Sequence, residues 1–341
     1  MSDGARVAVV GAGSWGTAVA ALVSNNADTV LWARRPDLAA TIAERHENPD
    51  YLPGIALPDA LRVTSDIGEA CGSADVVVLG VPSHGMRSVL MEAAEFVRPA
   101  VPVVSLAKGV EQGTLRRMTE VIGEVLPTHL PERIGVLTGP NLAREIAAGQ
   151  PAASVVAMGD EAAAHELQSL IMTVTFRVYT NPDVVGCEIA GALKNVMAIA
   201  AGIADGLGYG DNTKAALLTR GLAELTRLGI ALGGNPLTFS GLAGMGDLVA
   251  TCTSTQSRNR TVGVELGKGR CALTAKRPPG GLVLRCQEGK RSSFDAHPGR
   301  TSNPVGQPLR RVGQVIVDDQ VDVADVQATG GDVGRHQDVG P

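Results

Sequence analysis

Short apolar runs alternate with amphipathic stretches along the first half of the chain. The apolar runs lie at residues 6–10, 29–33, 75–81, 101–106 and 134–137. Apolar residues on consecutive positions predict strands that are buried on both faces, as in a parallel sheet. The stretches that separate these runs have helical spacing, and they lie at residues 17–24, 37–47, 85–96 and 114–126. Repeated strand–helix alternation predicts an α/β fold with a doubly wound parallel sheet.

Two further apolar runs continue this pattern. Residues 153–157 and 176–179 are strand candidates, and residues 161–172 between them have helical spacing. We expect both strands to extend the same sheet. The sequence therefore predicts a first domain over residues 1–181.

The sequence pattern changes after Asn181. The next segments are rich in Ala and Leu with helical spacing, at residues 182–207, 212–232 and 257–267. The first of them carries a stripe of large aliphatic residues at helical intervals, namely Ile189, Leu193, Val196, Ile199 and Ile203. Such a stripe is typical of the buried face of a helix. We predict an all-α domain over residues 182–270.

The composition changes again after Arg270. Large apolar residues become few, and Gly, Pro, Arg, Asp, Gln and Val replace them. This composition offers too little hydrophobic mass for a core. Residues 315–326 alternate apolar with acidic residues, which is compatible with a strand, but the composition favours disorder. We interpret residues 271–341 as an atypical tail that is either disordered or encoded in a shifted reading frame, since out-of-frame reading of a GC-rich gene yields Arg, Gly, Pro and Val.

Charge and length limit the classes of function. The 341 residues are enough for two domains, and the formal net charge is −5. This balance gives no global electrostatic attraction for nucleic acid or anionic membranes. We therefore expect neither a nucleic-acid nor a membrane partner. An anionic substrate requires a local cluster of cations.

Targeting and metal-binding signals are weak. The N-terminus enters a strand pattern almost at once, without the regions of a signal peptide. We identify no apolar run that approaches the ~20 residues of a membrane span, and we predict a cytoplasmic protein. The five cysteines are scattered without a CxxC pair, at Cys71, Cys187, Cys252, Cys271 and Cys286. We interpret them as reduced thiols, with no metal site.

A glycine-rich turn follows the first predicted strand and opens a helix. Residues 11–16 read GAGSWG, the spacing of a dinucleotide-binding turn. Gly11 makes the tight turn, Gly13 lets the backbone approach a pyrophosphate, and Gly16 lets the helix pack closely on the strand. The N–H groups of the helix N-terminus then face the phosphates. The sequence predicts a dinucleotide site here.

The end of the second strand predicts the choice of cofactor. A carboxylate at this place binds the ribose 2′-OH of NAD, but the chain has Arg34 and Arg35 there. Guanidinium groups bind a 2′-phosphate in bidentate fashion. We predict that NADP(H) is preferred. NAD(H) also binds if one arginine only stacks on the adenine.

A lysine follows the strand candidate at residues 101–106. Lys108 lies between an apolar run and Gly109. The residues 81–83 (VPS) follow the strand at 75–81 in the same way. Open α/β sheets bind ligands at the carboxyl ends of their strands. We therefore predict a functional role for Lys108.

Three longer stretches carry a resemblance to a known family. They are residues 139–145 (GPNLARE), 191–196 (GALKNV) and 241–248 (GLAGMGDL), and the last leads into SRNR at 257–260. Together with the glycine-rich turn they closely resemble the bacterial NAD(P)-dependent glycerol-3-phosphate dehydrogenases. The resemblance covers residues 6–270 and ends before the tail.

This resemblance implies a fold, a reaction and a partner. It implies a Rossmann domain followed by an α-helical substrate domain, and we also consider a homodimer. The implied reaction is the reversible, NAD(P)H-dependent reduction of dihydroxyacetone phosphate to sn-glycerol 3-phosphate, which supplies glycerophospholipid synthesis. In this family Glu-Gly follows later in the chain and contacts the cofactor. Here Glu288 and Gly289 lie at a suitable distance in unlike surroundings, and we interpret them as a coincidence.

The resemblance also implies site residues. Lys194 resembles the family's catalytic acid/base, with Lys108 and Asp247 beside it. The implied substrate contacts are Lys108, Gly139, Asn141, Lys194, Asp247, Ser257, Arg258 and Asn259. The implied cofactor contacts are Ser14, Trp15, Arg34, Lys108, Ala143 and Arg258. At Asn141 the family more often has serine, so an amide replaces a hydroxyl.

The chemistry of the residues agrees with these roles. Reduction of a ketone leaves negative charge on its oxygen, so a proton donor is needed nearby. A lysine in an apolar helix is costly unless its charge is paired or used. We expect that Gly191, Ala192 and Ala198 leave room for substrate beside Lys194, and that burial and neighbouring cations lower the lysine's pKa. Lys108 and Asp247 then orient the reacting groups.

A polar segment at residues 251–260 suits a phosphate. Ser257, Arg258 and Asn259 open a predicted helix, whose N–H groups and guanidinium can hold an anion. We expect Lys108, Lys194 and Arg258 to converge. This convergence explains how an acidic protein can bind a dianion.

Three alternatives compete with this interpretation. A 3-hydroxyacid or 6-phosphogluconate type of dehydrogenase does not explain residues 241–248 or the SRNR segment. A nucleotide-sugar dehydrogenase needs a nucleophilic cysteine, and no activating base is evident for Cys252. The third alternative is a non-catalytic NADP(H)-binding protein, if the altered C-terminus disables the helical domain.

Overall fold

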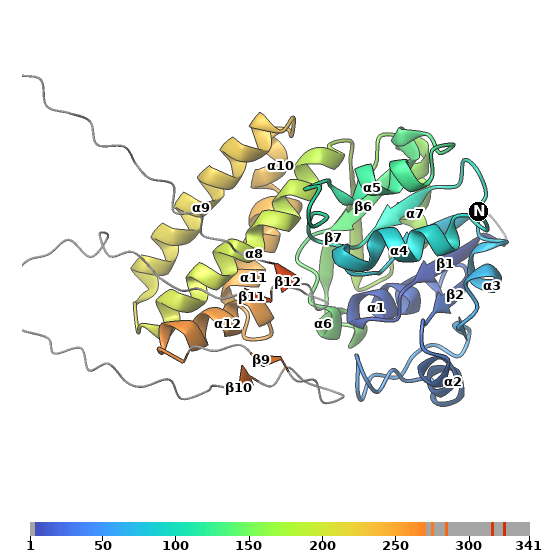
Figure 1. Cartoon of the computed structure of the whole chain (residues 1–341), viewed down its shortest axis with the longest axis horizontal. Helices are drawn as coiled ribbons and strands as arrows, with labels where there is room; N and C mark the ends of the chain where they lie inside the picture. The colour runs from blue at the N-terminus through green and yellow to red at the C-terminus, as the bar shows by residue number, and fades with distance from the viewer. Residues whose placement is uncertain (1–3, 271–273, 276–283, 286–314, 317–322, 325–341) are drawn as a thin grey trace, which may run out of the picture.

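An eight-stranded sheet between layers of helices forms the N-terminal part of the molecule, and a bundle of helices follows it (Figure 1). The computed structural model describes residues 4–270 and the pairs 274–275, 284–285, 315–316 and 323–324. The strands of the sheet are β1 (Arg6–Val10), β2 (Asp28–Trp32), β3 (Arg62–Thr64), β4 (Val76–Leu79), β5 (Val103–Ser105), β6 (Ile134–Thr138), β7 (Ala152–Ala157) and β8 (Phe176–Asn181). The predicted class, a Rossmann-type α/β sheet followed by helices, is confirmed.

The strand order is β3-β2-β1-β4-β5-β6-β7-β8. The strands from β3 to β6 are parallel, and β7 runs antiparallel to β6 and parallel to β8. The predicted parallel sheet is therefore found, with one antiparallel pair where β7 joins β6. A parallel crossover needs a dozen or more residues, usually with a full helix. The connection from β6 to β7, residues 139–151, contains only the short helix α6 (Ala143–Ala147) and not a full crossover helix.

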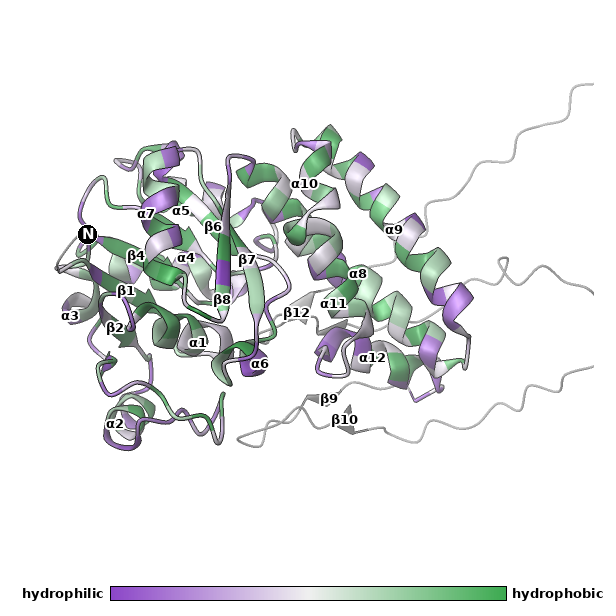
Figure 2. Cartoon of the chain, turned by 180° about the vertical axis from the view of Figure 1, so that it is seen from behind, coloured by the Kyte–Doolittle hydropathy of each residue, from purple (hydrophilic) through white to green (hydrophobic). Residues whose placement is uncertain are grey.

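Helices cover both faces of the sheet. They are α1 (Ser14–Val23), α2 (Pro36–Arg45), α3 (Ile67–Cys71), α4 (Ser83–Ala93), α5 (Met118–Val125), the 3₁₀ turn η1 (Pro131–Arg133) and α7 (Glu161–Ile171). One apolar cluster joins the sheet to α1, α2 and α7, and a second joins it to α3, α4 and α5. The strands β1, β2 and β4 are hydrophobic along most of their length (Figure 2). This two-sided burial explains why their sequences read as continuous apolar runs.

Helices form the next part of the described chain, up to residue 270. They are α8 (Val184–Gly206), α9 (Asp211–Ala231), α10 (Pro236–Ser240), the π-helical turn η2 (Leu242–Gly246), α11 (Asp247–Thr253) and α12 (Arg258–Gly267). In α9 the buried residues are Gly221, Leu225 and Gly229. Large apolar side chains such as Ile230 are about half exposed on this helix.

The buried face of α8 differs from the predicted stripe. Val196 is 58% exposed, and Leu193 is only partly buried. The buried positions are instead mostly small residues, including Ala190, Ala198 and Gly202. The predicted stripe therefore marks the core only in part: Ile189 is buried and Leu193 packs against the same apolar cluster, whereas Val196 faces outward. Close packing against the neighbouring helices needs small side chains on the rest of this face.

Two pairs of glycines bring α8 and α12 into backbone contact. A Cβ atom on Gly202 would lie 2.1 Å from the carbonyl oxygen of Arg260, and one on Gly263 would lie 2.1 Å from that of Ile199. One turn further, Gly206 and Gly267 meet in the same way, with 2.9 Å from a Cβ on Gly206 to the Cα of Gly267. The four glycines therefore set the distance between the two helices.

We predict that Gly202→Ala destabilises the protein by about 1–3 kcal/mol, the usual cost of overpacking a tight contact. The added methyl group has no room unless α12 moves away from α8. Gly210→Ala is the control, because a Cβ there has nothing within 4 Å and the residue has extended backbone. Urea unfolding of both variants measures the difference, and an equal change in the two would contradict the account.

One helix in the described part of the chain, α8, has the length and mean hydropathy (1.5) of a membrane span. The expectation that no segment has the length and hydropathy of a membrane span is therefore wrong for α8 when only its composition is considered. In the structure 56% of that apolar window is buried inside the protein, and the helix contains the buried Glu188 and Lys194. These are properties of a core helix.

Four two-residue strands lie after residue 270. β9 (Thr274–Ala275) pairs antiparallel with β10 (Leu284–Arg285), and β11 (Val315–Ile316) pairs antiparallel with β12 (Val323–Ala324). The second pair falls within the segment whose alternation is compatible with a strand. The predicted disorder of the tail concerns residues that lie outside those described.

Candidate active site

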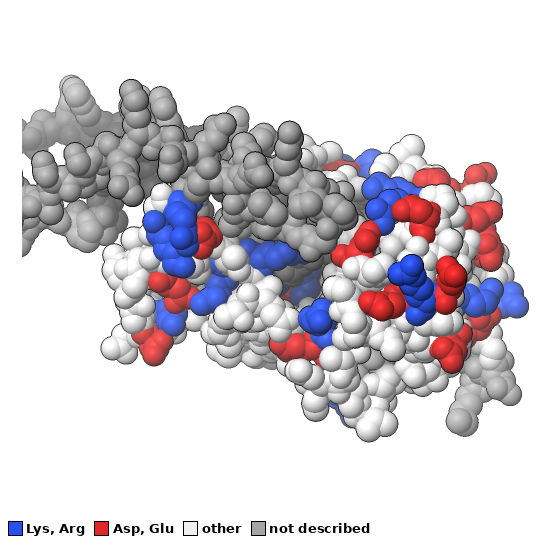
Figure 3. Space-filling model, turned by 90° about the horizontal axis from the view of Figure 1, so that it is seen from below, with Lys and Arg blue, Asp and Glu red and all other residues white. Residues whose placement is uncertain are grey.

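A pocket of about 270 Å³ lies between the carboxyl edge of the sheet and the helical part of the chain. Figure 3 shows Lys and Arg side chains around a hollow in this region. The sheet side contributes residues that follow β1, β4, β5 and β6, and the helical side contributes α8, α11 and the start of α12. The lining includes these predicted site residues: Ser14, Trp15, Lys108, Asn141, Ala143, Lys194, Asp247, Ser257 and Arg258.

The glycine-rich turn has the geometry that a dinucleotide requires. Gly11 has φ +119°, and a Cβ there would lie 2.6 Å from the carbonyl oxygen of Gly80. A Cβ on Gly16 would lie 2.0 Å from the carbonyl oxygen of Gly11. Gly13 is the N-cap of α1 and places no side chain over the first N–H groups. The turn therefore leaves the helix N-terminus accessible to a phosphate, as NAD(P) binding needs.

Ser14 and Trp15 continue this wall of the pocket. The Ser14 hydroxyl donates to the carbonyl oxygen of Tyr51 at 2.9 Å, so the loop after α2 closes over the start of α1. Trp15 is 6% exposed and packs against Phe176, with ring centroids 6.3 Å apart. Tyr51 also lines the pocket, although sequence reasoning did not select it.

The two predicted cofactor arginines have different environments. Arg34 follows β2 with an exposed side chain, and its charge adds to burial in lowering the pKa of His84 at the start of α4. Arg35 instead pairs with Asp50 and, at 3.9 Å, with Asp37. The structure therefore does not support the expectation that both guanidiniums are free to hold a 2′-phosphate, because carboxylates already neutralise Arg35.

Two lysines share one buried carboxylate at the floor of the pocket. Lys108 Nζ lies 2.8 Å from Asp247 Oδ2, and Lys194 Nζ lies 3.1 Å from Asp247 Oδ1. The side chains of Lys194 and Asp247 are 2% exposed, and that of Lys108 is 8% exposed. Residues from the loop after β5, from α8 and from α11, far apart in the sequence, thus form one buried charged cluster.

Thr251 completes this cluster. Its hydroxyl lies 2.5 Å from Lys194 Nζ and 3.3 Å from Asp247 Oδ1. Asp247 and Thr251 are four residues apart on α11, so they share a helix face. That spacing could have selected Thr251 from the sequence. The π-helical turn η2 positions the start of α11, and its Gly244 packs against the backbone of Phe239, where a Cβ would lie 2.2 Å from the carbonyl oxygen.

Gly191 makes room for a protein side chain. A Cβ on Gly191 would lie 3.3 Å from Thr138 Oγ1 and 3.6 Å from Lys108 Cγ. Gly191, Ala192 and Ala198 are not among the residues that line the pocket. The pocket lining therefore does not support the expectation that they leave space for substrate, and Gly191 instead lets the stem of Lys108 pass along α8.

Gly139 and Asn141 follow β6 at the same edge. Gly139 has φ +142°, and its carbonyl oxygen accepts a hydrogen bond from Lys108 Nζ at 2.8 Å. Asn141 donates through Nδ2 to Ser154 Oγ at 3.1 Å, which leaves its buried Oδ1 without a partner among the described residues. Asn141 therefore lines the pocket, whereas Gly139 lies outside the lining and holds Lys108 through its carbonyl oxygen.

The start of α12 forms the opposite wall. Ser257 is its N-cap and accepts from the N–H of Arg260 at 3.3 Å, and Arg258 follows on the pocket lining. Asn259 is 1% exposed, and its Nδ2 has no partner in the described part of the chain. Asn195, next to Lys194, is also buried and its Oδ1 lacks a described partner. Sequence reasoning did not select Asn195.

The cysteine alternative is not supported by the geometry. Cys252 is 2% exposed, and burial raises the pKa of its thiol to about 11. It is therefore a neutral thiol near pH 7 and a poor nucleophile. Cys71 and Cys187 are also buried and free, whereas Cys271 and Cys286 lie outside the described residues. Groups of three or more His, Cys, Asp or Glu that could hold a metal ion are absent from the described residues.

Two family models match the chain. One is described as the N-terminus of NAD-dependent glycerol-3-phosphate dehydrogenase and matches residues 6–164. The other, described as the C-terminus of the same enzyme, matches residues 183–289. The second match continues beyond the 6–270 range and includes Glu288 and Gly289.

Curated relatives and solved structures agree with these matches. A glycerol-3-phosphate dehydrogenase [NAD(P)+] 2 of Sphingopyxis alaskensis is 61% identical over 265 residues, which cover 78% of this chain and 79% of the relative. A glycerol-3-phosphate dehydrogenase [NAD(P)+] of Corynebacterium glutamicum is 54% identical over 290 residues, or 85% and 87% of the two chains. The crystal structure of glycerol-3-phosphate dehydrogenase from Coxiella burnetii has a TM-score of 0.74 at 36% identity and covers 78% of this chain and 81% of its own. The chain therefore belongs to the NAD-dependent glycerol-3-phosphate dehydrogenase family.

Proposed function

We propose that the protein catalyses the reversible, NAD(P)H-dependent reduction of dihydroxyacetone phosphate to sn-glycerol 3-phosphate, with Lys194 as general acid/base. The observation that carries this proposal is the shared buried carboxylate of Lys108 and Lys194 at the floor of a pocket whose other wall is the glycine-rich turn. The proposed cofactor is NADP(H), with NAD(H) as an alternative.

In this proposal the glycine-rich turn binds the cofactor, and the lysine cluster acts on the ketone oxygen of the substrate. When bound, the nicotinamide cofactor supplies or accepts the hydride. Lys194 Nζ gives a proton to the ketone oxygen as negative charge develops there, and it takes the proton back in the oxidation direction. Asp247 and Thr251 hold Lys194 Nζ in place. The second ammonium, on Lys108, stabilises the developing oxyanion.

The phosphate of the substrate fits the start of α12. Arg258 and the N-cap Ser257 line the pocket there. The first N–H groups of a helix bind anions, and a guanidinium adds two parallel hydrogen bonds. The buried Nδ2 of Asn259, which lacks a described partner, is a further donor beside this position. The protein as a whole is acidic, with a net charge of −5. These donors therefore provide the local attraction that a phosphate needs.

A comparison of two substrates tests the proposal. NADPH oxidation is followed with dihydroxyacetone phosphate and with dihydroxyacetone, which lacks the phosphate. We expect the phosphorylated ketone to be preferred in kcat/KM by at least about 100-fold, as buried charge-assisted contacts imply. In Arg258→Ala most of this preference should disappear. Equal turnover of the two ketones by the unaltered protein would exclude the proposed substrate.

The cofactor preference gives a separate prediction. Arg34→Ala should raise KM for NADPH about tenfold and leave KM for NADH within about twofold, because only NADPH has the 2′-phosphate that Arg34 can pair with. Arg35→Ala is the matched control, and we expect a smaller effect because Asp50 already pairs with Arg35. Steady-state kinetics with both cofactors measure this. A larger effect of Arg35→Ala would reverse the assignment of the two arginines.

The biological setting follows from the same proposal. The product, sn-glycerol 3-phosphate, supplies glycerophospholipid synthesis, and we propose that the enzyme acts in the cytoplasm. We also propose a homodimer. Its support is the half-exposed apolar surface of the helical part of the chain, which includes Leu228 and Ile230 on α9.

A further inference from the structure

A buried ion pair joins the sheet part of the molecule to α8, away from the lysine cluster. The Glu188 carboxylate on the second turn of α8 is 5% exposed. It accepts from Arg117 Nη1 at 2.7 Å, from the N–H of Thr119 at 2.9 Å and from the Thr119 hydroxyl at 2.5 Å. Burial raises the pKa of Glu188 despite these donors, so a carboxylate at this place depends on its partners.

Arg117 ends the loop at residues 106–117, which also carries Lys108. The loop runs from β5 to α5, and a bridge between Val110 and Arg117 closes it into a hairpin. The N–H of Glu111 donates to the carbonyl oxygen of Arg116 at 2.8 Å. A lysine of the site and the arginine of the buried pair are therefore held at the two ends of one short hairpin.

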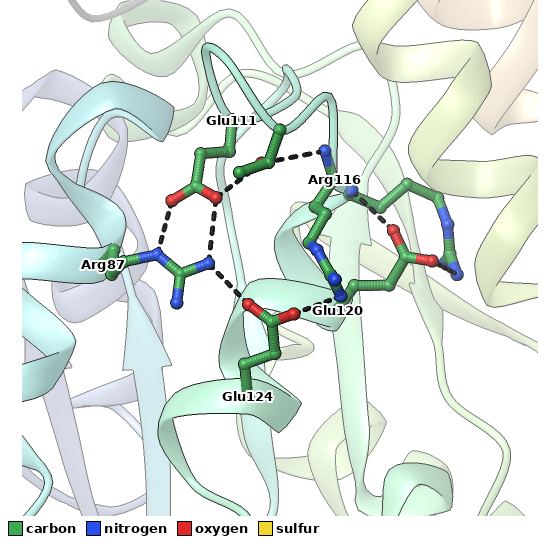
Figure 4. A network of polar contacts seen from close by, with 7 residues as sticks. Arg87, Glu111, Arg116, Glu120 and Glu124 are labelled. Atoms are coloured by element: carbon green, nitrogen blue, oxygen red, sulfur yellow. Dashed lines mark hydrogen bonds and ion pairs between the residues drawn. The ribbon is translucent and has the colours of Figure 1, made fainter.

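Ion pairs on the outer side fix this hairpin to α4 and α5 (Figure 4). Arg87 on α4 pairs with Glu111 of the hairpin at 2.7 Å and with Glu124 on α5 at 2.6 Å. Arg116 pairs with Glu124 as well. The hydrogen bond from Arg87 is the main cause that lowers the pKa of Glu111 to about 2. The outer side of the hairpin is therefore fixed to the sheet part, and its inner side contacts α8.

We propose that the Arg117–Glu188 pair is a positioning device for the reaction, which holds the hairpin against α8 so that Lys108 and Lys194 meet Asp247 together. Glu188 and Lys194 lie on the same helix, separated by about 9 Å of helix rise. Two ion pairs among the described residues then join this loop to the helical part: Arg117 with Glu188, and Lys108 with Asp247, which also binds Lys194. This inference rests on the proposed reaction of Lys194.

Loss of the pair should change catalysis more than cofactor binding. In Glu188→Gln the side chain keeps its shape and can still accept from Thr119, but the charge that pairs with Arg117 is gone. The loop then loses its ion pair with Glu188 of the helical part, and Lys108 Nζ is less well placed on Asp247. The glycine-rich turn binds the cofactor from β1 and α1, which the pair does not touch. A misplacement of about 1 Å in a catalytic group can cost 10²-fold in rate.

The test compares Glu188→Gln, Arg117→Ala and Arg117→Lys with Asp160→Asn in the full chain. Asp160 accepts from Arg133 at 2.9 Å on the sheet part, remote from α8, so it controls for the loss of an ordinary ion pair. We expect Glu188→Gln and Arg117→Ala to lower kcat for dihydroxyacetone phosphate about tenfold with KM for NADPH within about twofold. Arg117→Lys should recover part of kcat because it restores the positive charge. Asp160→Asn should keep kcat within about twofold.

A second measurement makes the outcome independent of turnover. Acetylation of Lys108 by acetic anhydride, read by mass spectrometry of the folded protein, should rise several-fold in Glu188→Gln and stay unchanged in Asp160→Asn. Unchanged labelling of Lys108 in both Arg117 and Glu188 variants would overturn the inference. If the unaltered protein turns over no dihydroxyacetone phosphate, the proposed function fails, while the labelling result still decides whether the pair positions Lys108.

Discussion

Lys194→Ala should lower kcat for the reduction of dihydroxyacetone phosphate by about 10²–10⁴-fold, the range for loss of a general acid/base. The lysine is buried at the pocket floor and lies 3.1 Å from Asp247 Oδ1 and 2.5 Å from the Thr251 hydroxyl, so no other described cation has the same position. NADPH binding should persist with a Kd within about twofold, because the glycine-rich turn is unchanged. Stopped-flow and fluorescence titration measure the two quantities.

Lys214→Ala is the control for this variant. Lys214 is also in the helical part and also pairs with a carboxylate, Asp205, at 3.2 Å. It lies outside the pocket lining, and we expect kcat to stay within about twofold. A Lys194→Ala protein that folds, binds NADPH and keeps its kcat would show that a different group carries the proton.

Asp247→Asn should lower both stability and activity. Its carboxylate contacts two buried ammonium groups, and the amide removes the negative charge that the two share. Breaking a buried ion pair by removing one partner costs about 3–5 kcal/mol. We expect a loss of this size in the free energy of urea unfolding at pH 7, together with a fall in kcat of at least about tenfold, since Lys108 and Lys194 then repel one another.

Asp75→Asn is the matched control for stability. Asp75 also accepts from an arginine, Arg98, and from the N–H of Arg6, but its side chain is 46% exposed. Exposed pairs contribute about 0–1 kcal/mol. The pKa of Asp75 is lowered by these donors, so its contribution is present at neutral pH and is lost as the pH falls below the carboxyl range. Equal losses of unfolding free energy in Asp247→Asn and Asp75→Asn would contradict the expectation that breaking the buried lysine cluster costs more than breaking an exposed ion pair.

The central strands were predictable because burial on both faces imposes a continuous apolar run. β1, β4 and β6 are almost wholly buried and match the predicted positions closely. β3 was missed because it has three partly exposed residues at the edge of the sheet. The reversal at β7 was missed because an apolar run does not record strand direction. Direction depends on the short connection through α6.

The site was predictable where a residue sits at a strand end or in a long motif. Lys108 follows β5, and the glycine-rich turn follows β1, so local sequence placed both at the ligand edge. Contacts between distant segments were not predictable in this way. The pairing of Arg35 with Asp50 and the packing of Lys108 along Gly191 depend on tertiary structure. Arg117 and Glu188 gave no local signal, because a carboxylate in a helix is most often exposed.

The helical part of the described chain exposes large apolar side chains. The Sphingopyxis alaskensis and Corynebacterium glutamicum relatives are matched over 79% and 87% of their own lengths. In the described part of this chain, α9 buries Gly221, Leu225 and Gly229, and large apolar residues such as Ile230 are half exposed. The same helical part of the molecule carries Lys194 and Asp247. Activity of the full chain is therefore the decisive property.

The most direct test measures NADPH binding and dihydroxyacetone phosphate turnover on one sample of the 341-residue protein. The account predicts that the protein binds NADPH and oxidises it when dihydroxyacetone phosphate is added, with formation of sn-glycerol 3-phosphate in equal amount. NADPH binding without any turnover would contradict it. That result would identify the chain as a dinucleotide-binding protein whose lysine cluster does not perform the reaction of its family.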